Sequence, residues 1–267
     1  IYNISGNFSA YGILISEGQN NSCKHTTIGN VTSSNGNAYG FSVDSSVDND
    51  FLTTIISQVK GSQDSYGLHI AICSDNLFVN SSMYDIDPAA DYDVFGLYLY
   101  HSNHNTFTKN LTIHGLEGDY YGYGIYMSSS NNNTFCDNIS ISNLSLNCLP
   151  GFGLYLSSSN DNLFMKDIKI TDFEVGAGDG YGIYLYSSYD NIFTGDIIIP
   201  NFNIYYDAYG ICLEDSNWNK FTAPINVTNW TYPTGQNFGV AGIYLNDSHY
   251  NTFEHGYIRA LETLSGL

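Results

Sequence analysis

Three stretches of the sequence share one pattern: residues 123–135 read YGIYMSSSNNNTF, residues 152–164 read FGLYLSSSNDNLF, and residues 181–193 read YGIYLYSSYDNIF. In each stretch, an aromatic residue and a glycine precede alternating apolar positions. An asparagine follows nine residues after the glycine, and a phenylalanine follows two residues later. Apolar residues with a period of two indicate β-strands, and a pattern that recurs at a fixed spacing indicates a repeat architecture.

The aromatic-glycine unit covers almost the whole chain. It begins at Tyr11, Tyr39, Tyr66, Phe95, Tyr123, Phe152, Tyr181 and Tyr209, and alanine replaces the aromatic residue in the last copy at Ala241. The spacings are 28, 27, 29, 28, 29, 29, 28 and 32 residues. Residues 11–267 therefore form nine copies, and residues 1–10 resemble the end of an incomplete preceding copy. We interpret residues 1–267 as a single domain.

Two columns of the repeat are filled in nearly every copy. The asparagines are Asn21, Asn49, Asn76, Asn105, Asn133, Asn162, Asn191, Asn219 and Asn251. Phenylalanine stands two residues after eight of them, and Cys23 takes its place in the first copy. A unit of this length cannot bury its apolar side chains alone, but stacked copies can. The pattern predicts a parallel β-helix of about nine and a half coils, about 45 Å long, with a buried asparagine ladder and a phenylalanine stack.

The signature GIYLxxSxxNxF resembles the right-handed β-helix repeat of NosD-like and pectate-lyase-like surface proteins over residues 11–267. The resemblance implies a right-handed, all-β solenoid. It does not select one function, because the architecture is shared by lyases, hydrolases, tailspikes and adhesins.

Composition narrows the choice of partners. The chain of 267 residues has 7 Lys and Arg against 26 Asp and Glu, which gives a formal charge of −19. Phosphate binding needs clustered basic residues, so nucleic acid is not expected as a partner, and anionic membrane surfaces are disfavoured. No apolar run is long enough to span a bilayer. The sequence begins at Ile1 without a leader, so we expect a secreted product, extracellular or at the cell surface.

Catalytic residues of the family are difficult to place on this sequence. The resemblance implies a catalytic Arg or Lys and clustered Asp in the lyases, yet Arg259 is the only arginine and the lysines share no column. It implies paired Asp near a Gly-His-Gly turn in the glycosidases, where this chain reads Glu254-His255-Gly256. Asp190, Glu214 and Asp215 could supply a carboxylate pair from neighbouring coils. We predict no catalytic residues and a protein that is not an enzyme, with a polysaccharide-degrading enzyme as an alternative.

No metal or cofactor is expected either. NosD-like proteins are linked to copper, but the shared turn of His101 and His104 has no Met or Cys beside it. A structural calcium ion near Asp172, Glu174 and Asp179 stays open, although no known calcium motif is present. The five cysteines form no CxxC pair, and a disulfide between Cys136 and Cys148 also stays open.

One column of the repeat predicts a surface stripe of tyrosines. If Ile125 and Met127 face the core, strand alternation directs Tyr126 to solvent. The same position gives the predicted stripe Tyr98, Tyr126, Tyr155, Tyr184 and Tyr244. Exposed stacked rings suit a sugar ligand or a lateral partner. Cross-strand stabilisation of the sheet explains them equally well.

Acceptor sequons for N-linked glycans are abundant. They lie at Asn3, Asn7, Asn20, Asn30, Asn80, Asn110, Asn132, Asn138, Asn143, Asn226, Asn229 and Asn246. None of the nine ladder asparagines is a sequon, and Asn110 and Asn138 share one outward column. We therefore expect a glycosylated surface around a protected core.

The first and last coils suggest self-assembly. Strand edges at the ends of a solenoid offer unpaired backbone groups, and neither end of this sequence reads as a capping helix. The predicted subunit contact comprises Ile1, Tyr2, Ile4, Phe8, Tyr257, Ile258, Leu261, Leu264 and Leu267. Our first hypothesis is a secreted structural protein that stacks head to tail into a homopolymeric filament or surface layer. The alternative is a carbohydrate-binding adhesin that uses the tyrosine stripe.

Overall fold

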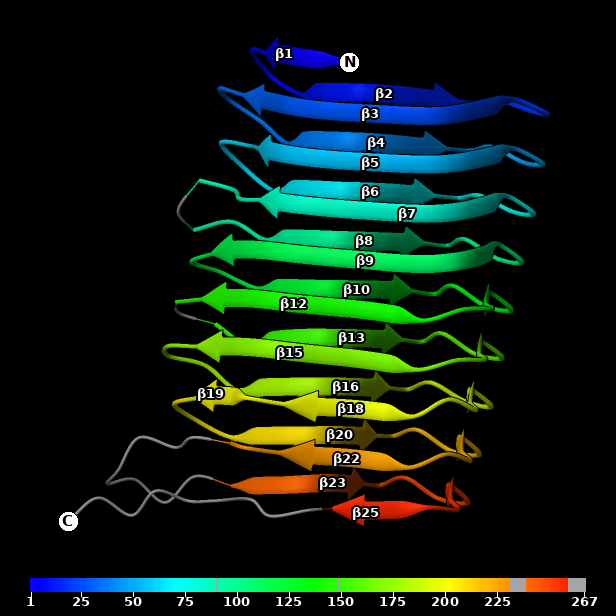
Figure 1. The fold of residues 1–267 in the computed structure, drawn as a ribbon, viewed down its shortest axis with the longest axis vertical. Coiled ribbons are helices and arrows are strands. Elements are labelled where there is room, and N and C mark those ends of the chain that lie inside the picture. Colours follow the sequence, from blue (N-terminus) through cyan, green and yellow to red (C-terminus); the bar gives the residue numbers. More distant parts are fainter. Residues whose placement is uncertain (90, 148, 231–238, 259–267) are drawn as a thin grey trace.

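A computed structural model describes residues 1–89, 91–147, 149–230 and 239–258, with side chains described to residue 255. The described residues contain 25 strands and no helix. All strand pairs are parallel, and each coil lies directly on the next from β1 at one end to β25 at the other (Figure 1). The predicted parallel β-helix is therefore confirmed.

One sheet has nine strands, one from each repeat, and contains the YGIYL motif. Its members, in spatial order, are β2 (Ala10–Ser16), β4 (Ala38–Asp44), β6 (Ser65–Ala71), β8 (Val94–Tyr100), β10 (Gly122–Ser128), β13 (Gly151–Ser157), β16 (Gly180–Tyr186), β20 (Ala208–Glu214) and β23 (Val240–Asn246). Equivalent repeat positions pair in register, as Tyr126 does with Tyr155.

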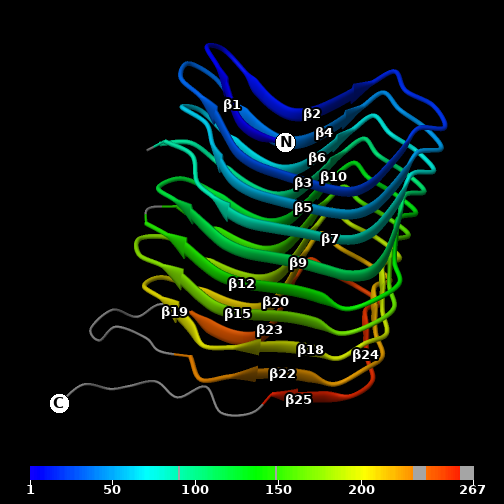
Figure 2. The ribbon, with the colours of Figure 1, turned by 45° about the horizontal axis from the view of Figure 1, so that its top comes forward.

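The other sheet has sixteen strands and runs in the opposite direction across the rod (Figure 1). Its long strands are β1 (Tyr2–Gly6), β3 (Ser22–Ser33), β5 (Asp50–Lys60), β7 (Leu77–Ile86), β9 (Thr106–Gly118), β12 (Ile139–Leu146) and β15 (Ile168–Val175). Its short strands are β11 (Thr134–Phe135), β14 (Leu163–Phe164), β17 (Ile192–Phe193), β18 (Ile197–Pro200), β19 (Phe202–Ile204), β21 (Lys220–Phe221), β22 (Ile225–Thr228), β24 (Thr252–Phe253) and β25 (Gly256–Ile258). Figure 2 shows that the coils share one bent outline.

The core consists of columns of identical side-chain types. The rings of the phenylalanine column stack at centroid distances between 4.6 and 4.9 Å from Phe51 to Phe253. The motif glycine packs against this core. A Cβ at Gly124 would lie 2.5 Å from the carbonyl oxygen of Gly153 and 2.7 Å from Ile141. The repeat therefore requires glycine there because backbone occupies the space of a side chain.

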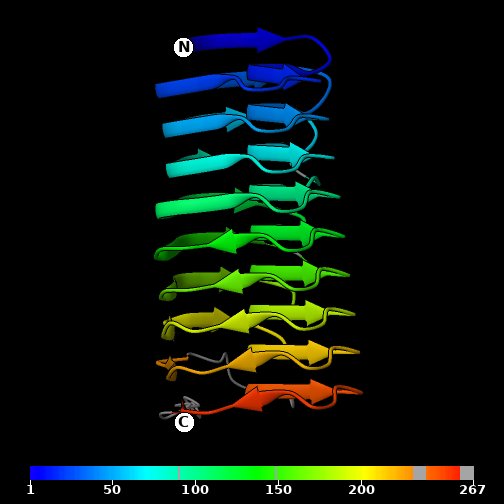
Figure 3. The same ribbon diagram turned by 90° about the vertical axis from the view of Figure 1, so that its right-hand side faces the viewer.

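The asparagine ladder forms the turn between the two sheets, which faces the viewer in Figure 3. The Asn133 amide nitrogens illustrate the pattern, since both the backbone N–H and Nδ2 donate to Asn162 Oδ1, at 2.9 and 3.2 Å. Nδ2 also donates to backbone carbonyls of its own turn and of the preceding coil. The ladder is continuous from Asn21 to Asn251, and its seven inner members are buried. The predicted ladder is confirmed.

A column of serines supports the same turn three residues earlier. The Ser130 backbone N–H donates to Ser159 Oγ at 3.0 Å, and the bond repeats along the column. Cys73 occupies this column in one coil, where its N–H donates to Ser102 Oγ. The buried turns thus satisfy their polar groups internally, as polar groups away from water must.

Candidate functional site: aromatic stripe, groove and coil ends

The tyrosine stripe lies on the outer face of the nine-stranded sheet. Tyr98, Tyr126, Tyr155 and Tyr184 come from consecutive strands and are half-buried. Their ring centroids are 5.2, 4.9 and 4.9 Å apart. Tyr244 stands two coils beyond Tyr184, and the buried Cys212 lies between them.

A second aromatic column lies beside the stripe, and the sequence did not predict its direction. The first residue of each motif, such as Tyr123 or Phe152, belongs to an outer aromatic cluster separate from the main core. Tyr123 stacks on Tyr126 of its own strand at 4.8 Å and on Phe152 of the next at 5.1 Å. Simple alternation fails at Gly124, because Tyr123 belongs to the outer cluster whereas Ile125, two residues later, belongs to the main core.

Stacking determines what the stripe can bind. The Tyr126 ring lies between Tyr98 and Tyr155 with interplanar angles of 20° and 10°. Both faces of this ring are therefore covered, and only edges and hydroxyls reach solvent. A sugar that packs on an aromatic face has no such face available in the middle of the stripe, which favours the cross-strand packing interpretation.

Several tyrosine hydroxyls donate to carboxylates. In the motif Asp-x-Tyr-Gly, the tyrosine hydroxyl donates a hydrogen bond to the aspartate Oδ2. The oxygen–oxygen distance is 3.1 Å both for Tyr66 with Asp64 and for Tyr209 with Asp207. Tyr184 donates to Glu214 at 2.5 Å. Burial raises the pKa of the Tyr184 phenol, and its hydrogen bond to Glu214 raises that pKa further. These phenols stay protonated donors at neutral pH.

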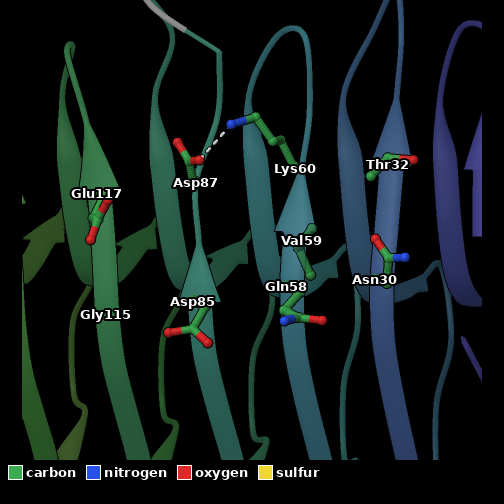
Figure 4. A pocket seen from close by; sticks show the side chains of 9 residues that line it. All are labelled: Asn30, Thr32, Gln58, Val59, Lys60, Asp85, Asp87, Gly115 and Glu117. Atoms are coloured by element: carbon green, nitrogen blue, oxygen red, sulfur yellow. Dashed lines mark hydrogen bonds and ion pairs between the residues drawn. The ribbon is translucent and has the colours of Figure 1, made fainter. Parts of the chain in front are cut away.

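A polar groove of about 540 Å³ crosses the outer face of β3, β5, β7 and β9 (Figure 4). Lys60 spans it to Asp87, with Nζ 2.7 Å from the carboxylate, and both side chains are largely exposed. Its remaining lining residues are Asn30, Thr32, Gln58, Val59, Asp85, Gly115 and Glu117. The groove offers amides, hydroxyls and carboxylates but no ring to stack on. It continues past Thr32 and Lys60 into a second hollow next to β1.

The sequon asparagines all lie at the surface. Nine are exposed, including Asn110, Asn132 and Asn138, and Asn80, Asn226 and Asn246 are half-buried. Seven of the twelve have a left-handed backbone, with φ between 54° and 58°: Asn3, Asn20, Asn30, Asn80, Asn132, Asn143 and Asn229. Asparagine tolerates this conformation better than most residues.

The fold itself explains several sequons. In Asn143-Leu144-Ser145, the asparagine makes the bend, the leucine is buried and the serine returns to the surface. Asn30-Val31-Thr32 repeats this arrangement. A coil that needs a bend asparagine, an inward apolar residue and an outward hydroxyl creates a sequon as a by-product. Sequon abundance alone is therefore weaker support for glycosylation than the placement of Asn110 and Asn138.

An exposed aromatic pair was not identified from the sequence. Trp218 and Tyr250 are 52 % and 70 % exposed and stack at 4.2 Å on neighbouring turns. Both have left-handed backbones, with φ of 63° and 58°. The other coils place Asn20, Asp48, Asp75, His104, Asn132, Asp161 and Asp190 in this column. Bulky rings at such φ values are unusual and cost conformational energy.

The first coil exposes apolar side chains. Ile1, Tyr2 and Phe8 are 49 %, 63 % and 75 % exposed, whereas Ile4 packs against the core. At the other end, the described side chains stop before Tyr257 and Ile258, although β25 includes their backbone. Leu261, Leu264 and Leu267 lie outside the described residues, as does Arg259.

The candidate metal ligands do not converge within the part of the chain that the structure describes. No group of three or more His, Cys, Asp or Glu side chains is placed there to hold a metal ion. Asp172 and Glu174 accept hydrogen bonds from Asn201 and Asn203, and Asp179 accepts from the backbone N–H of Asp207. Cys136 is a free thiol, and its possible partner Cys148 lies outside the described residues.

The described residues also contain no helix long and apolar enough to cross a membrane. Of the three carboxylates considered for glycoside hydrolysis, Glu214 accepts a hydrogen bond from the Tyr184 hydroxyl. Asp190 and Asp215 are exposed and lie at turns where their backbones are left-handed.

Comparison with known proteins gives one match. No curated protein and no solved structure is significantly similar to this sequence. The family profile described as "Right handed beta helix region" matches residues 11–198 and, in an overlapping alignment, residues 92–251. These ranges include every strand of the nine-stranded sheet except β2's first residue. Repeat, ladder and profile agree that the chain belongs to the right-handed β-helix family.

Proposed function

We propose that this protein is a secreted structural rod whose copies stack end to end into an extracellular filament or surface layer. A β-helix is consistent with a surface or carbohydrate-related protein. The proposed assembly needs neither a cofactor nor a catalytic group, and its partner is a second copy of the same chain. The proposal adds to the fold assignment by naming the surface through which copies would contact each other.

The direction of the asparagine ladder carries this proposal. Every hydrogen bond between two ladder asparagines runs one way, from an amide of one coil to the Oδ1 of the next. Among the described residues, nothing donates to Asn21 Oδ1 at the start of the ladder. At its far end, the one acceptor for Asn251 Nδ2 within residues 1–258 as described is the carbonyl oxygen of Ser216. One end therefore offers an acceptor and the other offers donors, which are complementary groups for a head-to-tail contact.

The edge strands at the two ends of the nine-stranded sheet also support head-to-tail stacking. β2 is the first strand of the nine-stranded sheet and β23 is the last, so within the described part of the chain each has one edge without a partner strand. An added parallel strand would satisfy these N–H and C=O groups in the geometry that the rod already uses. The exposed apolar side chains of Tyr2 and Phe8 would lose contact with water in the same step.

Electron microscopy and sedimentation of the 267-residue polypeptide test the proposal. Phe8→Lys places a charge at the first coil, where the side chain is 75 % exposed and contributes little to folding. Met165→Lys makes the same change on the side of the rod, where Met165 is 43 % exposed. We expect filaments from the wild type and Met165→Lys, and single rods from Phe8→Lys. Filaments of unchanged width and repeat from Phe8→Lys would place the contact elsewhere.

Carbohydrate binding is the second candidate, and the Trp218–Tyr250 pair favours it over the tyrosine stripe. Among the described aromatic rings, Trp218 is the one that stacks in parallel on Tyr250, so one face of the Tyr250 ring is covered in this way. An open aromatic face beside polar turns suits a pyranose ring. Trp218 is exposed whereas Trp230 is buried, so a neutral oligosaccharide should change the emission of Trp218 alone. A glycan titration of wild type against Trp218→Phe would detect it.

A further inference from the structure

The tyrosines of the outer sheet face form one unbroken path along the rod. Each of the nine coils from Tyr11 to Tyr244 contributes at least one tyrosine to it. Wherever the first motif position lacks tyrosine, at Phe95, Phe152 and Ala241, the fourth position supplies Tyr98, Tyr155 and Tyr244. The path runs through Tyr11, Tyr39, Tyr66, Tyr98, Tyr126, Tyr155, Tyr184, Tyr181, Tyr209 and Tyr244, and we call it the tyrosine path.

The rings of the tyrosine path are close enough to exchange electrons directly. Successive centroids lie 4.6, 4.8, 5.8, 5.2, 4.9, 4.9, 4.9, 5.3 and 5.2 Å apart. The longest step, from Tyr66 to Tyr98, changes column and avoids Phe95. A phenylalanine ring has no phenol to oxidise, so this detour keeps every step of the path between two tyrosines.

Proton acceptors accompany the path. An oxidised phenol must release its proton, and Tyr66, Tyr181, Tyr184 and Tyr209 already donate to Asp64, Asp179, Glu214 and Asp207. Tyr98, Tyr126 and Tyr155 are half-buried, so part of each side chain stays in contact with water, which can take the proton. Phenylalanine would serve equally well if these positions needed only a ring for packing, and two coils do have phenylalanine at the first motif position.

We propose that the tyrosine path carries oxidising equivalents along the rod when a one-electron oxidant, such as an oxidising radical or a high-potential metal complex, attacks one coil. The oxidant takes one electron from a tyrosine and is thereby reduced. The phenol proton passes to its carboxylate or to water, which leaves a neutral tyrosyl radical. That radical then takes an electron from the next tyrosine and recovers a proton, while the next tyrosine releases its own. The radical moves and the path behind it is restored.

The sequence offers a matched pair of variants. Tyr98→Phe removes the only path tyrosine of its coil, because Phe95 occupies the first position. Among described rings, Tyr100 contacts only Tyr98 and His101, so it provides no detour. Tyr123→Phe removes one hydroxyl from a coil that keeps Tyr126, and the contacts of Tyr126 with Tyr98 and Tyr155 remain. Both changes preserve a stacked ring.

The experiment generates the oxidant at one place. Each variant also carries Phe8→Lys, which should keep the rods single, so that Tyr244 of a neighbouring copy does not lie beside the label. Leu14, 49 % exposed on the first coil of the same face, is changed to cysteine and labelled with a ruthenium tris-bipyridyl complex. All other cysteines except the buried Cys73 and Cys212 are replaced by serine. A flash with a sacrificial electron acceptor produces Ru(III), and a radical trap with peptide mass spectrometry locates the tyrosyl radicals. Circular dichroism verifies that each variant is folded.

We expect trapped radical at Tyr244 in the parent and in Tyr123→Phe. In Tyr98→Phe, trapping at Tyr244 should fall several-fold while trapping at Tyr39 and Tyr66 rises. Equal trapping at Tyr244 in the two variants would overturn the proposal. So would a yield at Tyr244 that grows with protein concentration, because the radical would then travel between molecules.

Discussion

Asn133 and Asn162 lie in consecutive turns, and the first donates both its backbone N–H and its side-chain Nδ2 to Oδ1 of the second. Both side chains are almost completely buried. Each asparagine thus accepts hydrogen bonds from one neighbour and donates them to the other. Removing one side chain therefore leaves polar groups without a partner in both adjacent turns.

The first prediction concerns this ladder. Asn133→Ala should lower the free energy of unfolding by about 1 to 3 kcal/mol, because buried amides of the adjacent turns lose a partner. Urea unfolding measures the effect. Asn138→Ala is the control, since Asn138 is exposed and its side chain makes no hydrogen bond among the described residues. Losses of equal size at the two positions would mean that the buried ladder adds nothing.

The second prediction concerns the motif glycine. Gly124→Ala should destabilise the rod by about 3 kcal/mol, at the upper end for overpacking, because the new Cβ meets the backbone carbonyl of Gly153. Gly239→Ala is the control, since its nearest neighbour would be 3.4 Å away. Thermal unfolding of both variants measures the difference. A Gly124→Ala protein as stable as Gly239→Ala would show that the strands can separate to admit a side chain.

The third prediction concerns pH. Burial raises the pKa of Asp93 to about 6, and the neighbouring Asp64 adds to the shift, while the N–H of Tyr121 opposes it. The folded protein therefore holds this proton more tightly than the unfolded chain, in which an aspartate titrates near about 4. The contribution of Asp93 to the stability of the folded protein is therefore fully present below about pH 4, where the carboxyl is protonated in both states. It declines as the pH rises to about 6 and stays at the lower level above that.

Asp93→Asn tests this dependence, because asparagine keeps an acceptor for the N–H of Tyr121. Its melting temperature should exceed that of the wild type at pH 7.5 and equal it at pH 4. Asp161→Asn removes an equal charge from an exposed turn and controls for the net charge of −19. A gain that is the same at both pH values, or the same as that of Asp161→Asn, would contradict the assignment.

The fourth prediction concerns glycans. Asn110, Asn132 and Asn138 are exposed and should carry glycans in the protein from its native source. Peptide mass spectrometry before and after enzymatic deglycosylation measures the occupancy of each site. Unmodified asparagine at all three positions would leave the bend geometry as the whole explanation of the sequons.

Sequence periodicity predicted the features that repeat in every coil. The Asn133 and Phe135 columns could be assigned because one spacing fixes one position in the cross-section. The outward direction of Tyr123 could not, because the strand departs from alternation at Gly124. The Asp64–Tyr66 bond follows a visible Asp-x-Tyr-Gly spacing, but only the packed turn shows that the two side chains meet.

The Trp218–Tyr250 pair could not be predicted from the sequence for a different reason. The left-handed backbone of its column is a property of the turn, and neither aromatic residue signals such a conformation. The sequence predicts open strand edges at both ends, but it does not show the polarity of the ladder, which depends on which atoms donate and which accept between residues such as Asn219 and Asn251.

Asn251→Asp offers the most direct measurement of end-to-end stacking. An aspartate keeps the Oδ1 acceptor for the Asn219 amides but removes the side-chain donors. It also adds a negative charge that would face Asn21 of the next copy in the proposed stack. Asn138→Asp makes the same change on the side of the rod. Sedimentation velocity of the 267-residue polypeptide should show polymers for the wild type and Asn138→Asp, and single rods for Asn251→Asp. Single rods in all three, or polymers of equal size in all three, would contradict the account.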